Sequence, residues 1–129
     1  MVLQCKSALA TVATVNLEKL IAFYSQMLGQ IPQKHIPNVY AEFQLPGLQL
    51  GIFQYKQQNA PEFAAANGQM SLCLEVVDLN EAIACVADLG YPPPGEISTA
   101  SHGKEIYAYD PDCNRLILHQ STFKFKIEC

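Results

Sequence analysis

Residues 15–29 read V-N-L-E-K-L-I-A-F-Y-S-Q-M-L-G, and residues 77–90 repeat this pattern as V-D-L-N-E-A-I-A-C-V-A-D-L-G. When one residue of the first segment is left out of the alignment, the two segments share their first valine, one leucine, an Ile-Ala pair and the closing Leu-Gly. Apolar residues in both segments recur at the spacing of one helix face, which predicts two amphipathic helices. The chain is therefore predicted to contain two copies of one supersecondary unit, each built around such a helix.

The ends of both predicted helices carry suitable capping residues. Asn16 and Asp78 stand at the starts, where their side chains can accept hydrogen bonds from the N–H groups of the first turn. Gly29 and Gly90 suit the left-handed position that ends a helix. The matching caps make a chance similarity between two unrelated helices the weaker interpretation.

Each predicted helix follows a strand and precedes a hairpin. The strands before the helices are predicted at residues 10–15 and 71–77, where apolar and polar residues alternate. The hairpins are predicted from alternating segments joined by turn residues, and they comprise residues 39–45 with 48–53 and residues 106–109 with 116–119. Each half is thus β-α-β-β, with room for one more short strand.

Composition excludes several classes of protein. Of the 129 residues, half are hydrophobic and 16% are charged, with a net charge of −4, which is typical of one globular domain over residues 1–129. No basic patch indicates nucleic-acid binding, no apolar run could span a membrane, and no apolar signal segment precedes the first strand, so we expect a cytoplasmic protein. The five cysteines, without a CxxC pair, predict reduced thiols rather than a disulfide framework.

Three motifs in order resemble those of the vicinal-oxygen-chelate superfamily, which comprises glyoxalases, bleomycin-resistance proteins and extradiol dioxygenases. They are N-L-x-x-x-I-x-F-Y-x-x-x-L-G (residues 16–29), V-x-D-L-x-x-A-I-x-x-x-x-x-L-G (76–90) and Y-x-x-D-P-D-x-N-x-L-x-L (107–118), the last with Cys113 where the family usually has glycine. The resemblance covers about residues 8–120. It implies an α+β fold of two βαβββ modules, residues 8–54 and 70–120 with a tail at 121–129. The modules would form a partly open mixed-sheet barrel with the helices outside, and two chains would pair as a homodimer.

Many members of that superfamily hold a divalent metal ion inside the barrel. By resemblance, the four ligand positions fall at Leu9, Gln49, Ser71 and Ile117. Leu9 and Ile117 have no donor atom, and the neutral oxygens of the other two are weak ligands on their own. We therefore predict no metal and no cofactor, although His102, His119 and Glu75 could in principle build an altered metal site.

Without a metal the same fold can enclose a small molecule, as the bleomycin-resistance-like members do. Inward-facing strand positions are mostly apolar with a few polar tips, which is typical of a ligand pocket. Tyr40 and Tyr107 are predicted at equivalent places in the two repeats; the alternative is that these tyrosines only fill the barrel. The predicted pocket residues are Thr11, Tyr40, Gln49, Ser71, Cys73, Tyr107, Tyr109 and His119.

Three functions follow as hypotheses. The first is a metal-free small-molecule-binding protein whose ligand and catalytic residues are unknown. The second is a lyase, isomerase or dioxygenase-like enzyme. In it, His119, His102, Gln49 or Glu75 would build an altered site, or His119 or a tyrosine would act in metal-free acid–base chemistry. The third is a structural role with a vestigial cavity.

The alternating residues 123–127 are predicted as an additional edge strand.

Overall fold

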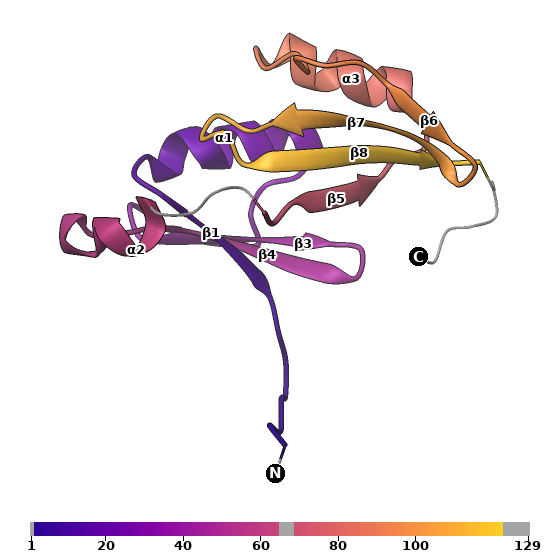
Figure 1. Ribbon diagram of the computed structural model, residues 1–129. Coiled ribbons are helices and arrows are strands. Elements are labelled where there is room, and N and C mark those ends of the chain that lie inside the picture. The colour runs from indigo at the N-terminus through magenta and orange to yellow at the C-terminus, as the bar shows by residue number, and fades with distance from the viewer. Residues whose placement is uncertain (1, 65–68, 123–129) are drawn as a thin grey trace. The chain divides into compact units, whose positions relative to one another are not determined.

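The structure is a computed structural model that describes residues 2–64 and 69–122, and the chain divides into two compact units, residues 1–66 and 67–129 (Figure 1). Each predicted module lies within one of these units. The predicted strand at residues 123–127 lies outside the described residues. No helix in the described part of the chain is long and apolar enough to cross a membrane.

The first unit is a βαβββ module with two short helical turns after it. Its elements are β1 (Ala10–Thr14), α1 (Leu17–Leu28), β2 (Lys34–Ile36), β3 (Tyr40–Leu45), β4 (Leu48–Gln54), the 3-10 turn η1 (Gln57–Asn59) and α2 (Ala60–Ala64). The sheet order is β1-β4-β3-β2, with β1 parallel to β4 and the other pairs antiparallel.

The second unit repeats that topology. Its elements are β5 (Leu72–Glu75), α3 (Leu79–Asp88), β6 (Ser98–Ala100), β7 (Gly103–Tyr109) and β8 (Arg115–Ser121). The sheet order is β5-β8-β7-β6, again with one parallel pair, β5 with β8. The two predicted βαβββ modules and the α+β class are thus confirmed. Each sheet is open at two edge strands and is not closed into a barrel.

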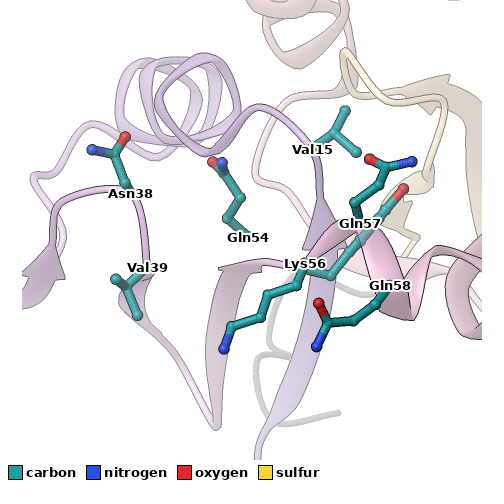
Figure 2. Close-up of a pocket in the computed structure, with 8 residues that line it drawn as sticks. Val15, Asn38, Val39, Gln54, Lys56, Gln57 and Gln58 are labelled. Atoms are coloured by element: carbon teal, nitrogen blue, oxygen red, sulfur yellow. The ribbon is translucent and has the colours of Figure 1, made fainter.

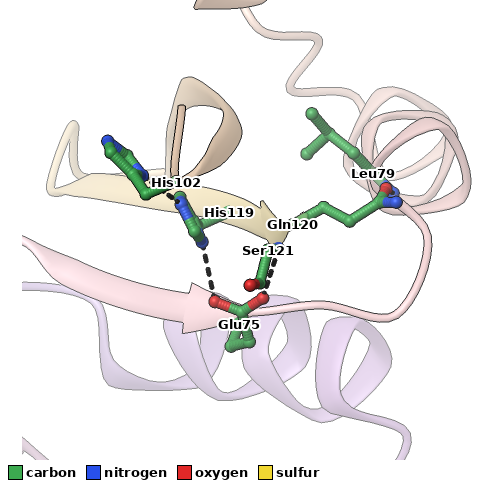
Figure 3. Close-up of polar contacts among 6 residues, drawn as sticks. All are labelled: Glu75, Leu79, His102, His119, Gln120 and Ser121. Atoms are coloured by element: carbon green, nitrogen blue, oxygen red, sulfur yellow. Dashed lines mark hydrogen bonds and ion pairs between the residues drawn. The ribbon is translucent and has the colours of Figure 1, made fainter. Parts of the chain in front are cut away.

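Both long helices begin in the same way. The Asn16 side chain accepts from the Lys19 N–H at 3.3 Å, and the Asp78 side chain accepts from the Glu81 N–H at 3.2 Å, as the sequence predicted. A glutamine from the last strand of each unit supplies a further acceptor for the first turn of the helix. In the first unit the Gln54 amide oxygen accepts from the Leu17 N–H at 3.1 Å. The corresponding bond in the second unit joins Gln120 to Leu79 at 2.7 Å (Figure 3). This glutamine is a second feature that the two repeats share.

One face of each sheet packs against its long helix. In the first unit α1 contacts β4, and its buried residues Leu17, Leu20, Ile21, Phe23 and Tyr24 face a core that includes Phe43 and Ile52. In the second unit α3 contacts β7 and β8, whose buried hydrophobic side chains are Ile106, Ala108, Leu116 and Leu118. Because side chains alternate along a strand, the residues between these positions point to the opposite face. That opposite face is where a ligand could bind.

Two connecting segments have a structure of their own, namely residues 57–64 and the turn between β7 and β8. The polar composition of residues 54–69 predicts a loop that joins the repeats, but residues 57–64 form η1 and α2. Pro61 is tolerated in a first helical turn, and the Phe63 ring stacks on the Tyr55 ring with their centroids 5.0 Å apart. In the β7–β8 turn, Cys113 has a φ of 69°, a conformation that costs a residue with a side chain about 1–2 kcal/mol. The buried Asp110 carboxylate accepts from the Asp112 and Asn114 N–H groups and so holds this turn together.

Candidate functional site

The face of the second sheet opposite α3 carries its side chains in three rows. In the middle row, Cys73 and Tyr107 both pair with Ile117, and in the last row Glu75 and Glu105 both pair with His119. In the first row Tyr109 pairs with Arg115, whose Nε donates to the Ser71 hydroxyl at 3.1 Å. Residues that pair across a ladder share a face, and successive rows lie about 7 Å apart.

Two side chains of the last row, Glu75 and His119, form a chain of hydrogen bonds with His102 from the turn between β6 and β7 (Figure 3). His119 Nδ1 lies 2.7 Å from Glu75 Oε1, and His119 Nε2 lies 3.1 Å from His102 Nδ1. The other carboxylate oxygen of Glu75 accepts from the Ser121 N–H at 2.7 Å. The His119 side chain is only 15% exposed, so its position is well defined by these contacts.

The position of the two imidazoles depends on Gly103, which follows His102. The rings of His102 and His119 stack at 19° with their centroids 5.2 Å apart. A Cβ on Gly103 would lie 3.0 Å from His119 Nε2 and 2.4 Å from the Gln120 carbonyl oxygen. The two-residue turn between β6 and β7 therefore brings His102 over β8 only because residue 103 has no side chain.

The middle and first rows are less polar. Tyr107 is 50% exposed, Ile117 is half-buried between Tyr107 and Cys73, and the Arg115 guanidinium carbon lies 5.8 Å from the centre of the Tyr107 ring. The row of Tyr107, Ile117 and Cys73 thus lies between a guanidinium row and an imidazole–carboxylate row.

On the first sheet, the face opposite α1 is organised around Glu42. Its Oε1 accepts from the Tyr40 hydroxyl at 2.9 Å, and its Oε2 accepts from the side-chain amides of Gln33 at 2.9 Å and Gln49 at 2.6 Å. The Tyr40 ring lies over Gly51, where a Cβ would meet its hydroxyl at 2.7 Å. Glu42 is a site residue that the sequence analysis missed.

These contacts change the ionisation of both groups. Hydrogen bonds from Tyr40 and then from Gln33, with a smaller contribution from the positive charge of Lys34, lower the pKa of Glu42. Desolvation first, and then the bond to the Glu42 carboxylate, raises the pKa of the Tyr40 hydroxyl. The pair is therefore held as a carboxylate and a neutral phenol, and the phenol O–H is used in the bond to the carboxylate.

Replacement of Glu42 by glutamine should make the first unit less stable at neutral pH but not in acid. A carboxylate whose pKa is lowered by folding stabilises the protein above its unfolded pKa, about 4.5, and that contribution is lost as the pH falls through the folded value. We expect the difference in melting temperature between the wild type and E42Q to shrink from pH 7 to pH 3. Thermal unfolding followed by circular dichroism measures it, and a difference that is constant with pH would contradict the assignment.

A separate hollow lies near the start of α1 (Figure 2). It has a volume of about 530 Å³ and contains several side-chain amides and one cation, Lys56. It holds none of the predicted pocket residues, and the Gln54 amide in its wall already caps α1. Its lining residues are Val15, Asn38, Val39, Gln54, Tyr55, Lys56, Gln57 and Gln58.

The four positions at which the superfamily would hold its metal do not fit one here. The Gln49 amide donates to Glu42, and Ser71 accepts from a guanidinium, which would repel a metal cation. Within residues 2–64 and 69–122, no group of three or more His, Cys, Asp or Glu side chains could hold a metal ion. Glu75, His119 and His102 do come together, but the Glu75 carboxylate and the His102 ring contact different nitrogens of His119.

The registers correct two predictions. Ala10 pairs with Leu50 and Leu72 with Leu116, which places Gln49 beside Leu9 and Arg115 beside Ser71. Gln49 and Ile117, predicted as the two hairpin ligand positions, are therefore not at equivalent places in the two repeats. Tyr40 and Tyr107 are not equivalent either. Tyr40 pairs with Phe53 and so lies in the row of Ala13. Tyr107 lies in the row of Cys73. Cys73 corresponds to Thr11 of the first unit, not to Ala13, so the two tyrosines are in different rows.

All eight predicted pocket residues lie on or beside the sheet faces opposite the helices. Tyr40 and Gln49 meet at Glu42, Thr11 is in the same row as Glu42, and His119 meets Glu75. Ser71, Tyr107 and Tyr109 gather around Arg115, which the sequence analysis also missed. Its position at the start of β8, two residues before Ile117 in an alternating strand, was the available signal.

Two βαβββ units, each with one face of its sheet covered by a helix, define a known class of fold. The chain has a TM-score of 0.65 to a glyoxalase/bleomycin resistance protein from Catenulispora acidiphila, at 23% identity over 88% of this chain and 96% of that one. It has a TM-score of 0.73 to the fosfomycin resistance protein FosX from Listeria monocytogenes, at 16% identity over 97% and 100%. A glyoxalase-related enzyme from Fulvimarina pelagi gives 0.65, at 21% identity over 90% and 89%.

The chain therefore has the fold of the vicinal-oxygen-chelate superfamily, as its three motifs predicted. At these identities the fold is what the proteins share. No protein-family model matches the sequence, and no curated protein is significantly similar to it.

Proposed function

We propose that this chain binds a small molecule without a metal ion, on the face of the second sheet opposite α3. The observation that carries the proposal is the arrangement of that face. An apolar row with the half-exposed Tyr107 and Ile117 lies between the Arg115 row and the His119 row. Pockets for small molecules commonly combine an apolar surface with a few polar groups that fix orientation.

The rows suggest the shape of the ligand. Arg115 and His119 are four residues apart on β8, a distance of about 13 Å, and the planar ring of Tyr107 and the side chain of Ile117 lie in the row between them. A ligand with a flat apolar body and hydrogen-bonding groups at both ends would match this face. The proposal includes a cytoplasmic location and a homodimer, the latter as the resemblance implies.

A screen for ligands, together with a metal analysis, tests the proposal. Elemental mass spectrometry should find no stoichiometric metal in the purified protein, before or after dialysis against Ni²⁺, Zn²⁺, Mn²⁺ and Fe²⁺. Aromatic and antibiotic-like compounds that raise the melting temperature should bind at least about tenfold more weakly to Y107A, because the flat ring is lost. V77A is the matched control, since Val77 is 97% exposed and lies outside this face. Near-stoichiometric metal, or equal binding to both variants, would contradict the proposal.

A second candidate function, an enzyme with an altered site, is favoured by the contact between His119 and Glu75. A histidine oriented by a carboxylate is a common acid–base group. Each compound that binds should therefore be followed by proton NMR for conversion to a product. Conversion by the wild type that is lost in H119Q would favour the enzyme.

A further inference from the structure

The hydrogen bonds around Glu75 determine which nitrogen of each neighbouring imidazole carries a proton. The Ser121 backbone N–H is a fixed donor and uses one carboxylate oxygen of Glu75, while the other oxygen faces His119 Nδ1 (Figure 3). An ionised carboxylate only accepts, so His119 Nδ1 must be the protonated nitrogen. In a neutral imidazole the second nitrogen, His119 Nε2, is then an acceptor.

The same reasoning extends to His102. Its Nδ1 lies 3.1 Å from the acceptor His119 Nε2, so Nδ1 must carry the proton of a neutral His102. His102 Nε2 is left with a lone pair, and no hydrogen bond among the described residues uses it. Because His102 is exposed, this lone pair is accessible from solvent.

We propose that Glu75, His119 and His102 form a relay that presents His102 Nε2 as a proton acceptor to a ligand with a weakly acidic O–H or N–H group. The inference rests on the proposed function, because the ligand is the molecule bound on this face. In the limiting case the ligand O–H or N–H bond breaks and an N–H bond forms at Nε2. The ligand is then an anion and His102 an imidazolium, linked through His119 to the negative charge of Glu75.

The relay predicts an unusual effect of the E75Q substitution, which replaces the carboxylate by an amide of the same shape. The oxygen of the introduced amide must face the Ser121 N–H, so its NH₂ group would face His119 Nδ1 and donate to it. His119 would then carry its proton on Nε2 and donate to His102 Nδ1. His102 in turn would carry its proton on Nε2, and the terminal acceptor would become a donor.

Imidazole ¹⁵N NMR in mildly alkaline solution, where imidazoles are neutral, reads these tautomers directly. We expect the Nδ1–H form for His102 and His119 in the wild type and the Nε2–H form for both in E75Q. E18Q is the matched control, because Glu18 contacts a different histidine, His35, at 3.3 Å. It should leave both tautomers unchanged. The amide spectrum shows that E75Q is folded. Nε2–H forms in the wild type, or no change in folded E75Q, would overturn the relay.

Two probes, one with a phenolic O–H group and one with a methyl ether in its place, test the ligand class. We expect the wild type to bind 4-nitrophenol about tenfold more tightly than 4-nitroanisole, which has no O–H group, and E75Q to lose this preference. Absorbance of the bound phenolate reports any proton transfer. Equal preference in the wild type and E75Q would overturn the relay but leave small-molecule binding intact. Tight binding of 4-nitroanisole with no preference for the phenol would overturn the ligand class, whereas an absence of all ligands for the wild type would instead count against the proposed function.

Discussion

Replacement of Gly103 by alanine should lower the free energy of unfolding of the second unit by about 3–5 kcal/mol. Two costs add at this position. Its φ of 149° is one that residues with a side chain rarely adopt, and the added methyl group would lie 2.4 Å from the Gln120 backbone oxygen. That oxygen belongs to the β7–β8 ladder and cannot move without disturbing it. The methyl group would also displace the His119 ring, so the Nδ1–H tautomer of His119 should be lost.

Gly90 provides the matched control for this substitution. It lies in the same unit and also has a positive φ, 101°, but a methyl group there would meet nothing within 4 Å. G90A should therefore cost only the backbone strain, about 1–2 kcal/mol. Urea unfolding of both variants measures the difference, which isolates the steric contribution. Equal costs would show that β8 can shift and that residue 103 does not position the imidazoles.

The helices could be predicted from the sequence because their signals are local. The caps Asn16 and Asp78 and the apolar periodicity place α1 and α3 within one or two residues of their observed ends. The strands β2 and β6 were only allowed for, since each has three exposed residues and no alternation to recognise. The helical turns at residues 57–64 were not predicted, because a glutamine-rich segment is typical of a loop. The contacts of Phe63 with the Phe53 and Tyr55 rings exist only in the folded unit.

The site was harder to predict because its contacts join residues that are distant in sequence. Glu75 and His119 were both named as candidates, yet they are 44 residues apart and meet only through the parallel register of β5 and β8. Glu42 was missed because a carboxylate in an alternating strand normally faces solvent. Its donors on Gln33 and Gln49 lie on other segments, and only the sheet brings them to it.

Replacement of Phe43 by alanine should lower the free energy of unfolding of the first unit by about 3–5 kcal/mol. The Phe43 side chain is fully buried, and the centroid of its ring lies 6.4 Å from that of the Tyr24 ring. Phe53, in the same hairpin, points to the opposite face and is only partly buried, with an edge contact to Phe63 at 5.4 Å. F53A should therefore cost about 1 kcal/mol.

Urea unfolding of these two variants compares the same side chain on the two faces of one sheet. The expected difference means that the helix-covered face supplies most of the stability, which leaves the other face able to change its residues for binding. That division explains how sheets of one fold can carry different residues on the face opposite the helix and still fold. Similar costs for F43A and F53A would contradict it, because both faces would then be needed for the core.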